Sequence, residues 1–419
     1  MPFIQFYFEV HQPRRLYPGS VMNLKNIKTL EDLEKAIFDD SKNKEVLNKV
    51  AHKCYIPMNS LLLEMLDTYP YFKFSFSITG TLLEQLELYN SDALELFKQM
   101  AQHKRVEVLG ETYFHSLSSF WGIGSEREEF EEQIYLHMQA LKDYLGIKKD
   151  PQTFRNTELL YNNSIAKTIE KLGFKAMLLE GIEWVMQGKS PNMLYKAHNS
   201  NLILYARNYP LSDDIAYRFS ARWFSHWPLT ADKYAAWLAS TPGEVINLFM
   251  DYETFGEHQW ADTGIFEFMK HLPYEVEKYE HLGFATFRET SQMFKPIDEL
   301  YVDDLATVSW ADLERDASAW LGNDMQRYAF KELYFLGNMI KQHLKGTPHY
   351  EKALKIWRYL QTSDHLYYMS TKNWADGDVH KYFSPYETPH DAFEGLIKAI
   401  IGFKLLLTKQ GALHESLDH

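Results

Sequence analysis

Carboxylates and histidines gather in four short stretches of this sequence. His11 opens the first stretch, Glu111 opens the second, Glu158 lies in the third, and the fourth runs from Asp251 to His258. Paired carboxyl groups can hydrolyse a glycoside, because a neutral acid protonates the leaving oxygen while an ionised one attacks or stabilises an oxocarbenium-like carbon. Glu158 and Asp251 are the candidates for such a pair.

Each of these stretches follows a segment that reads as a β-strand. Short apolar, β-branched or aromatic runs alternate with longer helical patterns through the first two-thirds of the chain, which predicts a parallel sheet built from βαβ units. Several runs are apolar on both faces, as strands covered on both sides should be. The predicted strands are Phe3–Val10, Phe72–Ile78, Val106–Leu109, Thr153–Thr157, Ala176–Leu179, Leu202–Ala206 and Val245–Met250.

The acids sit after the predicted strands, at the end where α/β barrels place their active sites. The same positions suit helix capping, because Asp is a preferred N-cap residue and both acids favour helix N-termini. For any single acid, spacing alone leaves the two roles open. From about residue 310 the strand signals fade and amphipathic helices follow one another, which predicts a helical C-terminal region.

Composition narrows the classes of function. The 419 residues include 44 Lys and Arg against 57 Asp and Glu, a formal charge of −13, which argues against nucleic-acid partners. Cys54 is the only cysteine, so no intramolecular disulfide and no all-thiolate metal cage can form. No signal peptide or membrane span is recognisable, and we expect a cytoplasmic protein.

Five stretches in order make the sequence resemble glycoside hydrolase family 57. They are FEVHQP, LGETYFHSL, FRNTELLYNN, MDYETFGEHQW and SDHLYYMSTK, spread from His11 to Lys372. The resemblance implies an α/β fold in which a seven-stranded parallel (β/α) barrel over residues 1–300 precedes a helical domain over residues 301–419 that completes the active site. It also implies a retaining double displacement on α-glucans, with no cofactor and no metal.

The resemblance assigns roles residue by residue. Glu158 carries over as the nucleophile and Asp251 as the general acid/base. A retaining enzyme should hold the two carboxyl groups roughly 5 to 5.5 Å apart. The other family positions are expected to bind the sugar: His11, Glu111, Trp260 and Asp364. Each also has a purely structural alternative. His11 could be a buried histidine at the barrel mouth, Glu111 could cap a helix, Asp364 could cap a turn and Trp260 could pack in the core.

Two rival classes stay open at this point. Histidines near acids could surround a divalent metal, as in related barrel deacetylases or mannosidases, although no H-x-x-x-H pair is present. The chain could also be a non-catalytic carbohydrate-binding homologue, against which the presence of both catalytic acids argues. Nucleotide binding and Ser or Cys nucleophiles lack their motifs, G-x-G-x-x-G, Walker A and G-x-S-x-G.

Within the family, amylases, branching enzymes and glucanotransferases share the catalytic pair. The stretch SDHLYYMSTK and the tetrapeptide WLGN at Trp320–Asn323 are most similar to the α-amylase group. We therefore expect an α-amylase-like hydrolase of α-1,4-glucosidic bonds acting on an α-glucan or maltooligosaccharide. A 4-α-glucanotransferase or branching transferase is the alternative, because an acceptor sugar in place of water would turn hydrolysis into transfer.

Overall fold

The computed structural model describes residues 2–122, 127–372 and 384–409. The chain divides into two compact units, each formed from three segments. The first unit contains Met1–Gln12, Glu45–Tyr113 and Gly122–Trp310, and the second contains Pro13–Lys44, Phe114–Trp121 and Ala311–His419. The sequence predicts two domains, residues 1–300 and residues 301–419, and this domain division stays a prediction.

The first unit is an α/β fold around a seven-stranded parallel barrel. Its strands are β1 (Phe3–Val10), β2 (Phe74–Ile78), β3 (Val106–Val108), β4 (Thr153–Phe154), β5 (Ala176–Glu180), β7 (Ile203–Arg207) and β8 (Val245–Asp251). All seven are predicted from the sequence. The largest difference in bounds is at β4, which ends at Phe154 rather than Thr157, because the chain turns into a 3-10 helix there.

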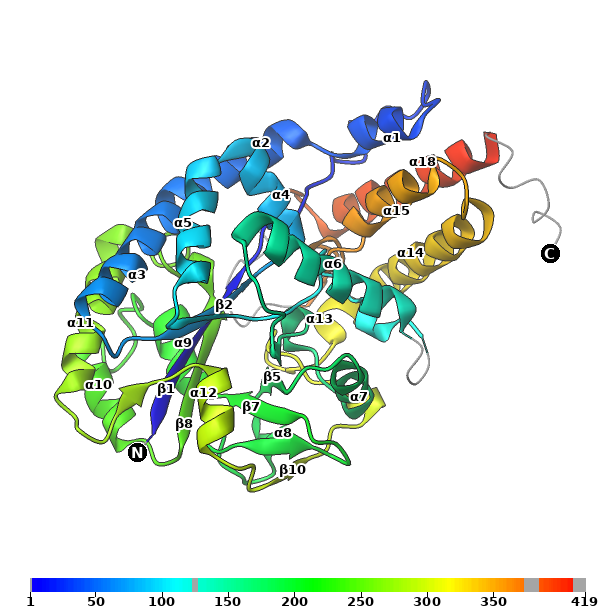
Figure 1. Ribbon diagram of the computed structural model, residues 1–419. Coiled ribbons are helices and arrows are strands. Elements are labelled where there is room, and N and C mark those ends of the chain that lie inside the picture. Colours follow the sequence, from blue (N-terminus) through cyan, green and yellow to red (C-terminus); the bar gives the residue numbers. More distant parts are fainter. Residues whose placement is uncertain (1, 123–126, 373–383, 410–419) are drawn as a thin grey trace. The chain divides into compact units, whose positions relative to one another are not determined.

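Two runs of hydrogen-bonded strands make up the barrel wall, in the orders β3-β2-β1-β8 and β4-β5-β7. A parallel bridge between Gly110 and Phe154 joins β3 to β4. On the other side, the backbone N–H of Asn208 donates to the carbonyl of Asn247 over 2.9 Å, which joins the end of β7 to β8. In Figure 1, β1 and β8 run side by side through the middle of this unit.

Three further short strands are not predicted: β6 (Tyr195–Ala197), β9 (Gly283–Phe284) and β10 (Asp298–Leu300). β6 pairs antiparallel with β7, β10 pairs with β6, and β9 pairs with the start of β1. Segments of two or three residues, two of them containing charged side chains, leave no apolar run or alternation for a pattern to detect.

Burial on both faces explains the composition of the strands. Every residue of β2 and β5 is buried, and β1 is buried from Ile4 to Val10. A parallel strand covered on both sides needs apolar residues without alternation. Aromatic rings fill part of the interior, where Tyr7 and Phe249 meet edge to face with ring centroids 5.6 Å apart. The barrel wall is therefore a packed core that can hold strand ends in fixed positions.

Helices follow the strands of the first unit. They are α3 (Ile56–Thr68), α4 (Gly80–Tyr89), α5 (Ser91–Gln102), α6 (Glu128–Leu145), α7 (Asn163–Lys171), α8 (Glu183–Met186), α9 (Tyr209–Ala216), α10 (Ala231–Ser240), α11 (Ile265–Glu277) and α12 (Phe287–Met293). α2 (Asp40–Val50) continues into a π-helix at Ala51–Tyr55 before α3 begins. Among the described residues, no helix is both long and apolar enough to cross a membrane.

The second unit is helical, as the sequence predicts for the end of the chain. Its helices are α1 (Leu30–Ile37), α13 (Ser318–Leu321), α14 (Asp324–His343), α15 (Tyr350–Tyr359), α16 (Ser363–Tyr367) and α18 (Pro389–Lys409). α14 packs against both α15 and α18 (Figure 1). Gly337 permits the first contact, because a Cβ there would lie 2.0 Å from the Trp357 ring. The Trp357 indole donates to the Leu333 carbonyl over 2.8 Å.

Candidate active site

The strands that carry the candidate acids are neighbours in the barrel. β1 lies between β2 and β8, and the register places Glu9 opposite Ser77 on one side and Asp251 on the other. Because the strands are parallel, their carboxyl ends open on one end of the barrel. Glu111 follows β3, Glu158 follows β4 and Asp251 ends β8, so all three carboxyl groups follow strands at that end.

Glu158 is held in a backbone conformation that residues with a side chain seldom adopt. Its φ is 56° and its ψ is 28°, inside the 3-10 helix Thr157–Leu159. Such left-handed positions cost about 1–3 kcal/mol and persist only where neighbouring groups enforce them. Here Ser309 Oγ donates to the Glu158 carbonyl over 2.9 Å, and the Trp310 N–H donates to it over 3.3 Å. These two hydrogen bonds hold the turn that carries Glu158.

Trp310 also binds the Glu158 side chain. Its indole Nε1–H donates to Glu158 Oε2 over 2.8 Å. The indole is itself held by cations, because the guanidinium carbon of Arg155 lies 4.8 Å from its ring centroid and that of Arg207 lies 5.8 Å away. Cations over an indole face attract its π-electrons. The ring that positions the Glu158 carboxylate is thus fixed from several sides.

A buried ionic network lies beside Glu158, within the barrel. Arg155 is fully buried, and its Nε lies 3.3 Å from Glu9 Oε2. The same oxygen accepts the Tyr7 hydroxyl over 2.6 Å and the Ser77 hydroxyl over 3.0 Å. Burial lowers the pKa of Arg155, but the charge of Glu9 and the groups beyond it outweigh burial and raise it above its ordinary value. Arg155 therefore stays a cation in the barrel.

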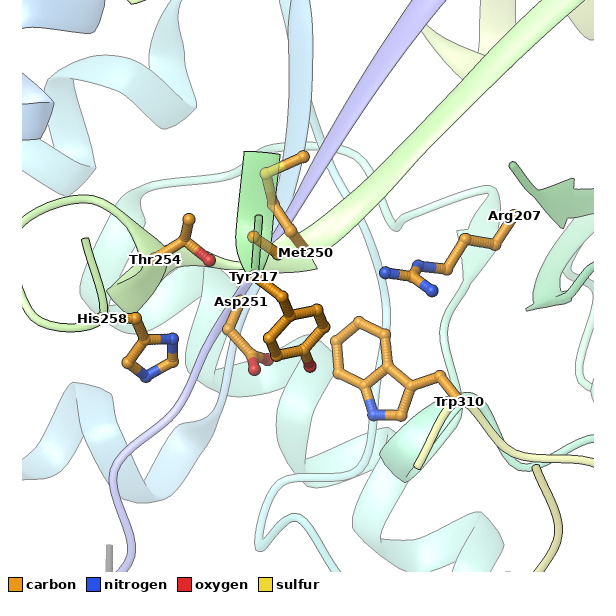
Figure 2. Close-up of a pocket in the computed structure, with 8 residues that line it drawn as sticks. Arg207, Tyr217, Met250, Asp251, Thr254, His258 and Trp310 are labelled. Carbon is orange, nitrogen blue, oxygen red and sulfur yellow. The ribbon is translucent and has the colours of Figure 1, made fainter. Parts of the chain in front are cut away.

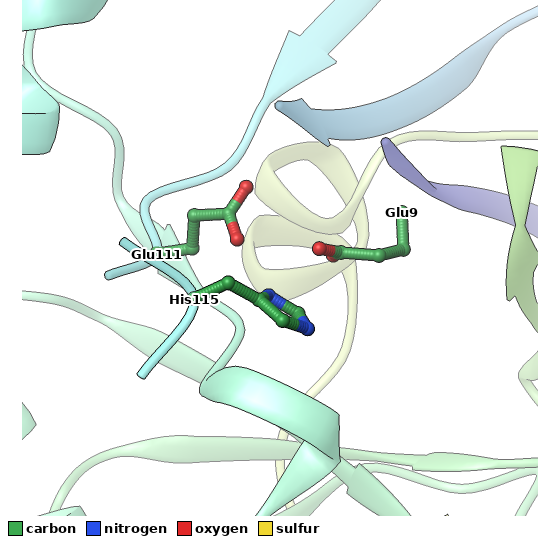
Figure 3. Close-up of side chains that lie close together, drawn as sticks. All are labelled: Glu9, Glu111 and His115. Carbon is green, nitrogen blue, oxygen red and sulfur yellow. The ribbon is translucent and has the colours of Figure 1, made fainter. Parts of the chain in front are cut away.

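Glu111 lies close to this network. One carboxylate oxygen of Glu111 and one of Glu9 lie within 4.8 Å of each other (Figure 3). The Glu111 backbone N–H donates to His137 Nδ1 over 3.2 Å, while His137 Nε2 lies 2.9 Å from the Ile78 carbonyl. Burial lowers the pKa of His137 to about 4, so the ring is neutral and Nε2 carries its proton. α6 thereby fixes the turn after β3.

The two close carboxylates could in principle attract a cation. In this barrel the guanidinium of Arg155 already supplies a positive charge beside Glu9, and the charge of Glu111 also acts on it. Paired carboxylates compensated by a buried arginine need no metal ion for charge balance. Arg155 therefore balances part of the negative charge of this set.

Asp251 lines a pocket at the end of β8. The other lining residues are Arg207, Ala216, Tyr217, Met250, Thr254, His258 and Trp310. Figure 2 shows the Asp251 carboxylate between the imidazole of His258 on one side and the rings of Tyr217 and Trp310 on the other. Trp310 therefore connects the two candidate acids, since it lines the pocket of one and binds the carboxylate of the other.

Arg207 forms the wall of this pocket and is itself tied down. Its guanidinium donates to Glu180 Oε2 over 3.1 Å, to Asp213 Oδ1 over 2.5 Å and to the Phe249 carbonyl over 2.9 Å. Burial lowers the pKa of Arg207, but Asp213 and Glu180 outweigh burial and raise it above its ordinary value. The pocket thus has a permanent cation whose donors are directed at protein groups.

A neutral carboxyl group lies two residues beyond Asp251. Glu253 is buried, and its Oε1 accepts the Tyr55 hydroxyl over 2.5 Å. Burial, and to a smaller extent the nearby charge of Asp251, raise the pKa of Glu253 from its ordinary value of 4.5 to about 8. Near pH 7 Glu253 is therefore mostly protonated, which limits the negative charge around Asp251.

The remaining predicted site residues occupy three different places. His11 follows β1, and its Nδ1 lies 2.9 Å from the Thr79 hydroxyl at the N-terminus of α4. Trp260 is 53% exposed, with Lys53 Nζ 5.3 Å from its ring centroid, so it is not a core residue. Asp364 belongs to the second unit, where its Oδ2 accepts the Thr362 hydroxyl over 2.9 Å. Sugar contacts by these residues stay predictions.

Sequence reasoning assigns no specific role to three residues that shape the site. Arg155 lies in the stretch that contains Glu158, and Arg207 directly follows the predicted strand Leu202–Ala206, so position alone could have flagged both. Neither a motif nor a position after a predicted strand marks Trp310 in the sequence. It is one of ten tryptophans, and its partner Glu158 is 152 residues away in the chain.

A model of a known protein family matches this chain. The model for glycosyl hydrolase family 57 matches residues 5–303. A curated protein of Methanocaldococcus jannaschii, provisionally named an alpha-amylase, is 50% identical over 404 residues, which cover 96% of this chain and 84% of that protein. An alpha-amylase of Pyrococcus abyssi is 23% identical over 266 residues, covering 61% of this chain and 38% of that protein.

Solved structures share the fold of this chain at low identity. A branching enzyme from Thermococcus kodakaraensis matches with a TM-score of 0.68 at 13% identity, over 97% of this chain and 90% of that one. The alpha-amylase AmyC from Thermotoga maritima matches with a TM-score of 0.59 at 13% identity, over 99% and 98%. A 4-alpha-glucanotransferase from Thermococcus litoralis matches with a TM-score of 0.59 at 15% identity, over 87% and 54%.

Proposed function

The chain belongs to glycosyl hydrolase family 57, and we propose that it hydrolyses α-1,4-glucosidic bonds of an α-glucan with retention of configuration. Glu158 is the proposed nucleophile and Asp251 the proposed general acid/base. One observation carries the proposal. Asp251 lines a pocket together with Trp310, whose indole N–H binds the Glu158 carboxylate over 2.8 Å.

The surroundings of Glu158 suit a nucleophile. Attack on an anomeric carbon requires an ionised carboxylate with a fixed direction of approach. The indole N–H and the nearby guanidinium of Arg155 both stabilise a negative charge on Glu158. The left-handed backbone and the two hydrogen bonds to its carbonyl set the direction.

The surroundings of Asp251 suit a group that gives and takes one proton. Asp251 is partly exposed at the end of β8, so it can exchange protons with water in the pocket. The neighbouring carboxyl of Glu253 is coupled to it electrostatically, and burial keeps Glu253 mostly neutral near pH 7. General acid/base catalysis works best when the pKa of the group lies near the working pH.

The proposed reaction proceeds in two displacements. First, Glu158 forms a bond to the anomeric carbon while the bond to the leaving oxygen breaks, and Asp251 gives that oxygen its proton. Second, Asp251 removes a proton from water as the water oxygen attacks the anomeric carbon, which releases Glu158. We assign His11, Glu111 and Asp364 to contacts with the attacked sugar and Trp260 to stacking on a neighbouring one.

Transfer to an acceptor sugar is the competing function. The same covalent intermediate would pass the glycosyl group to a sugar hydroxyl instead of water. The fold is shared with a branching enzyme and a 4-alpha-glucanotransferase, while the 50% identical relative is named as an amylase. We place hydrolysis first because that relative covers nearly the whole chain.

Product analysis tests the function. Wild type is incubated with soluble starch and defined maltooligosaccharides beside Glu158→Gln, Asp251→Asn and the control Asp298→Asn, an exposed carboxylate on β10. New reducing ends from wild type and the control alone support hydrolysis by the named pair. Unchanged reducing ends with redistributed chain lengths indicate a transferase. Equal products from all four proteins would refute the assignment.

The stereochemistry is tested on the same samples. A retaining enzyme releases the α-anomer first, which proton NMR detects in the first minutes before mutarotation. Release of the β-anomer would indicate inversion, which requires carboxyl groups about 6.5 to 9.5 Å apart. That result would remove the nucleophile role from Glu158 while leaving glycoside hydrolysis in place.

A further inference from the structure

An exposed aromatic loop follows α9 in the first unit. We define it as residues 217–228, of sequence YRFSARWFSHWP. Three of its large side chains are turned to solvent: Tyr217 is 59% exposed, Trp223 is 78% exposed and Trp227 is 45% exposed. Large apolar side chains that are exposed together indicate a binding surface, whereas a single exposed one does not.

The base of the aromatic loop is firmly packed. Phe219 and Leu229 are buried, and the Phe219 ring meets Phe268 of α11 edge to face at 5.2 Å. Arg218 donates to Asp214 Oδ1 over 2.7 Å and to the Pro210 carbonyl over 2.6 Å. These contacts hold both ends of the loop against the barrel helices.

The outer part of the aromatic loop is ordered by its own contacts. The N–H groups of Ala221, Phe224 and Trp227 each donate to the carbonyl three residues earlier, over 3.1, 2.9 and 2.9 Å. The Arg222 guanidinium carbon lies 5.8 Å from the Trp227 ring centroid, and His226 meets Trp237 of α10 edge to face at 4.9 Å. A preorganised surface loses little conformational entropy when a ligand binds.

The loop begins at the catalytic pocket. Tyr217 and Ala216 line the pocket with Asp251, and Gln259 Nε2 donates to the Ala216 carbonyl over 3.0 Å. Trp223 is six residues beyond Tyr217, so their Cα atoms lie at most about 22 Å apart. Trp223 therefore lies within reach of a ring that lines the pocket of the proposed acid/base.

We propose that Trp223 and Trp227 form an extended subsite that holds a distal part of the α-glucan chain whose cleaved bond lies at Asp251. This subsite rests on the proposed function. The C–H faces of glucose rings stack on indole faces, and the hydroxyls at the ring edges accept hydrogen bonds from exposed donors such as Arg222. An α-glucan carries no charge, so the subsite needs no cluster of positively charged side chains.

Binding to a catalytically inactive protein provides the first test. Asp251→Asn is titrated with maltoheptaose, with maltotriose and with the β-linked cellohexaose while tryptophan fluorescence and heat are recorded. Trp223→Ala or Trp227→Ala in the same background should raise the Kd for maltoheptaose roughly fivefold to thirtyfold, the range of an aromatic anchor in an interface. The Kd for maltotriose should change less. Trp223→Tyr should recover part of the loss, because a ring face is restored.

Kinetics on the otherwise native enzyme provide the second test. Each alanine variant should raise KM for long amylose several-fold more than KM for maltotriose. Tyr274→Ala, which removes an exposed ring on α11, is the matched control and should leave both KM values unchanged. Size-exclusion chromatography of every variant reports whether the loop joins two copies of the chain.

The outcomes separate this inference from the proposed function. If wild type cleaves α-glucans and both tryptophan variants match it on long chains, the subsite is refuted and the function stands. If wild type cleaves nothing but Asp251→Asn binds maltoheptaose through both tryptophans, the function fails and the subsite stands. A dimer that either substitution dissociates, or equal affinity for cellohexaose, would overturn the inference in favour of another occupant.

Discussion

Replacing Trp310 by Phe tests how the structure positions the proposed nucleophile. The substitution removes the indole N–H that donates to Glu158 Oε2 over 2.8 Å and retains an aromatic ring near Arg155 and Arg207. The hydrogen bonds that the Ser309 hydroxyl and the Trp310 backbone N–H donate to the Glu158 carbonyl do not involve the indole. The change therefore isolates one contact to the carboxylate.

The expected loss follows from the strength of that contact. A hydrogen bond to a charged group contributes about 1.5–3 kcal/mol. Each 1.36 kcal/mol of transition-state stabilisation corresponds to a factor of about ten in rate. Trp310→Phe should therefore lower kcat/KM roughly 10- to 150-fold. Because the contact acts on the reacting carboxylate rather than on distant sugars, most of the loss should fall on kcat.

The assay is initial-rate hydrolysis of maltoheptaose over a range of pH, with the melting temperature recorded in parallel. Losing a donor to the carboxylate favours its neutral form, so the acidic limb of the rate profile should move to higher pH. Trp237→Phe on α10 serves as the control, since Trp237 is not among the described residues that line the pocket of Asp251. Activity within twofold of wild type and an unmoved acidic limb would refute the positioning role.

Four further expectations follow from the same geometry. Arg155→Met should cost about 3–5 kcal/mol in the free energy of unfolding by denaturant, because it leaves Glu9 buried without its cation, and a second change of Glu9 to Gln should restore part of that loss. Gly256→Ala should be severely destabilising, because its φ is 105° and a Cβ would lie 1.9 Å from a carbonyl oxygen of the π-helix. Gly264→Ala is the comparison: its φ is 86° and no atom lies within 4 Å of a Cβ built there, so a thermal melt should show a loss of only about 1 kcal/mol. Burial raises the pKa of Glu253 from 4.5 to about 8, so the contribution of its protonation to folding stability is fully present below pH 4.5 and is lost as the pH rises through 8. The free energy of unfolding of the wild type should therefore fall between these pH values, and Glu253→Gln should flatten the decline. Extensive chelation should leave hydrolysis unchanged, and loss of activity that added zinc restores would revive the metal hypothesis.

The strands and the order of the acids are accessible from sequence because their signals are local. The run FIQFYFEV predicts a strand covered on both faces, and the structure has β1 over those same residues. Asp251 and Glu158 stand out because each follows such a run. Strand ends of a parallel barrel meet at one end whatever the details of the loops, so composition and position suffice for that part of the site.

The support of those acids is not accessible in the same way, because it depends on contacts between distant segments. The Tyr55 hydroxyl that binds Glu253 is 198 residues away in the chain, and the indole that binds Glu158 is 152 residues away. Neither donor belongs to a pattern of period 2 or 3.6 that would mark it. Only the folded barrel brings such donors to their carboxylates.

The two proposed catalytic acids are held by different means, and the difference matches their roles. Asp251 ends a regular strand with relaxed backbone angles, φ −65° and ψ 139°, at a pocket that water can reach. Glu158 occupies a left-handed conformation that residues 309 and 310 enforce from outside its own segment.

A group that exchanges a proton twice in one catalytic cycle needs access to water more than rigidity. A group that forms a bond to carbon needs its direction fixed before the substrate arrives, because small displacements of a reacting atom cost large factors in rate. The strained backbone at Glu158 therefore supports its proposed role as the nucleophile.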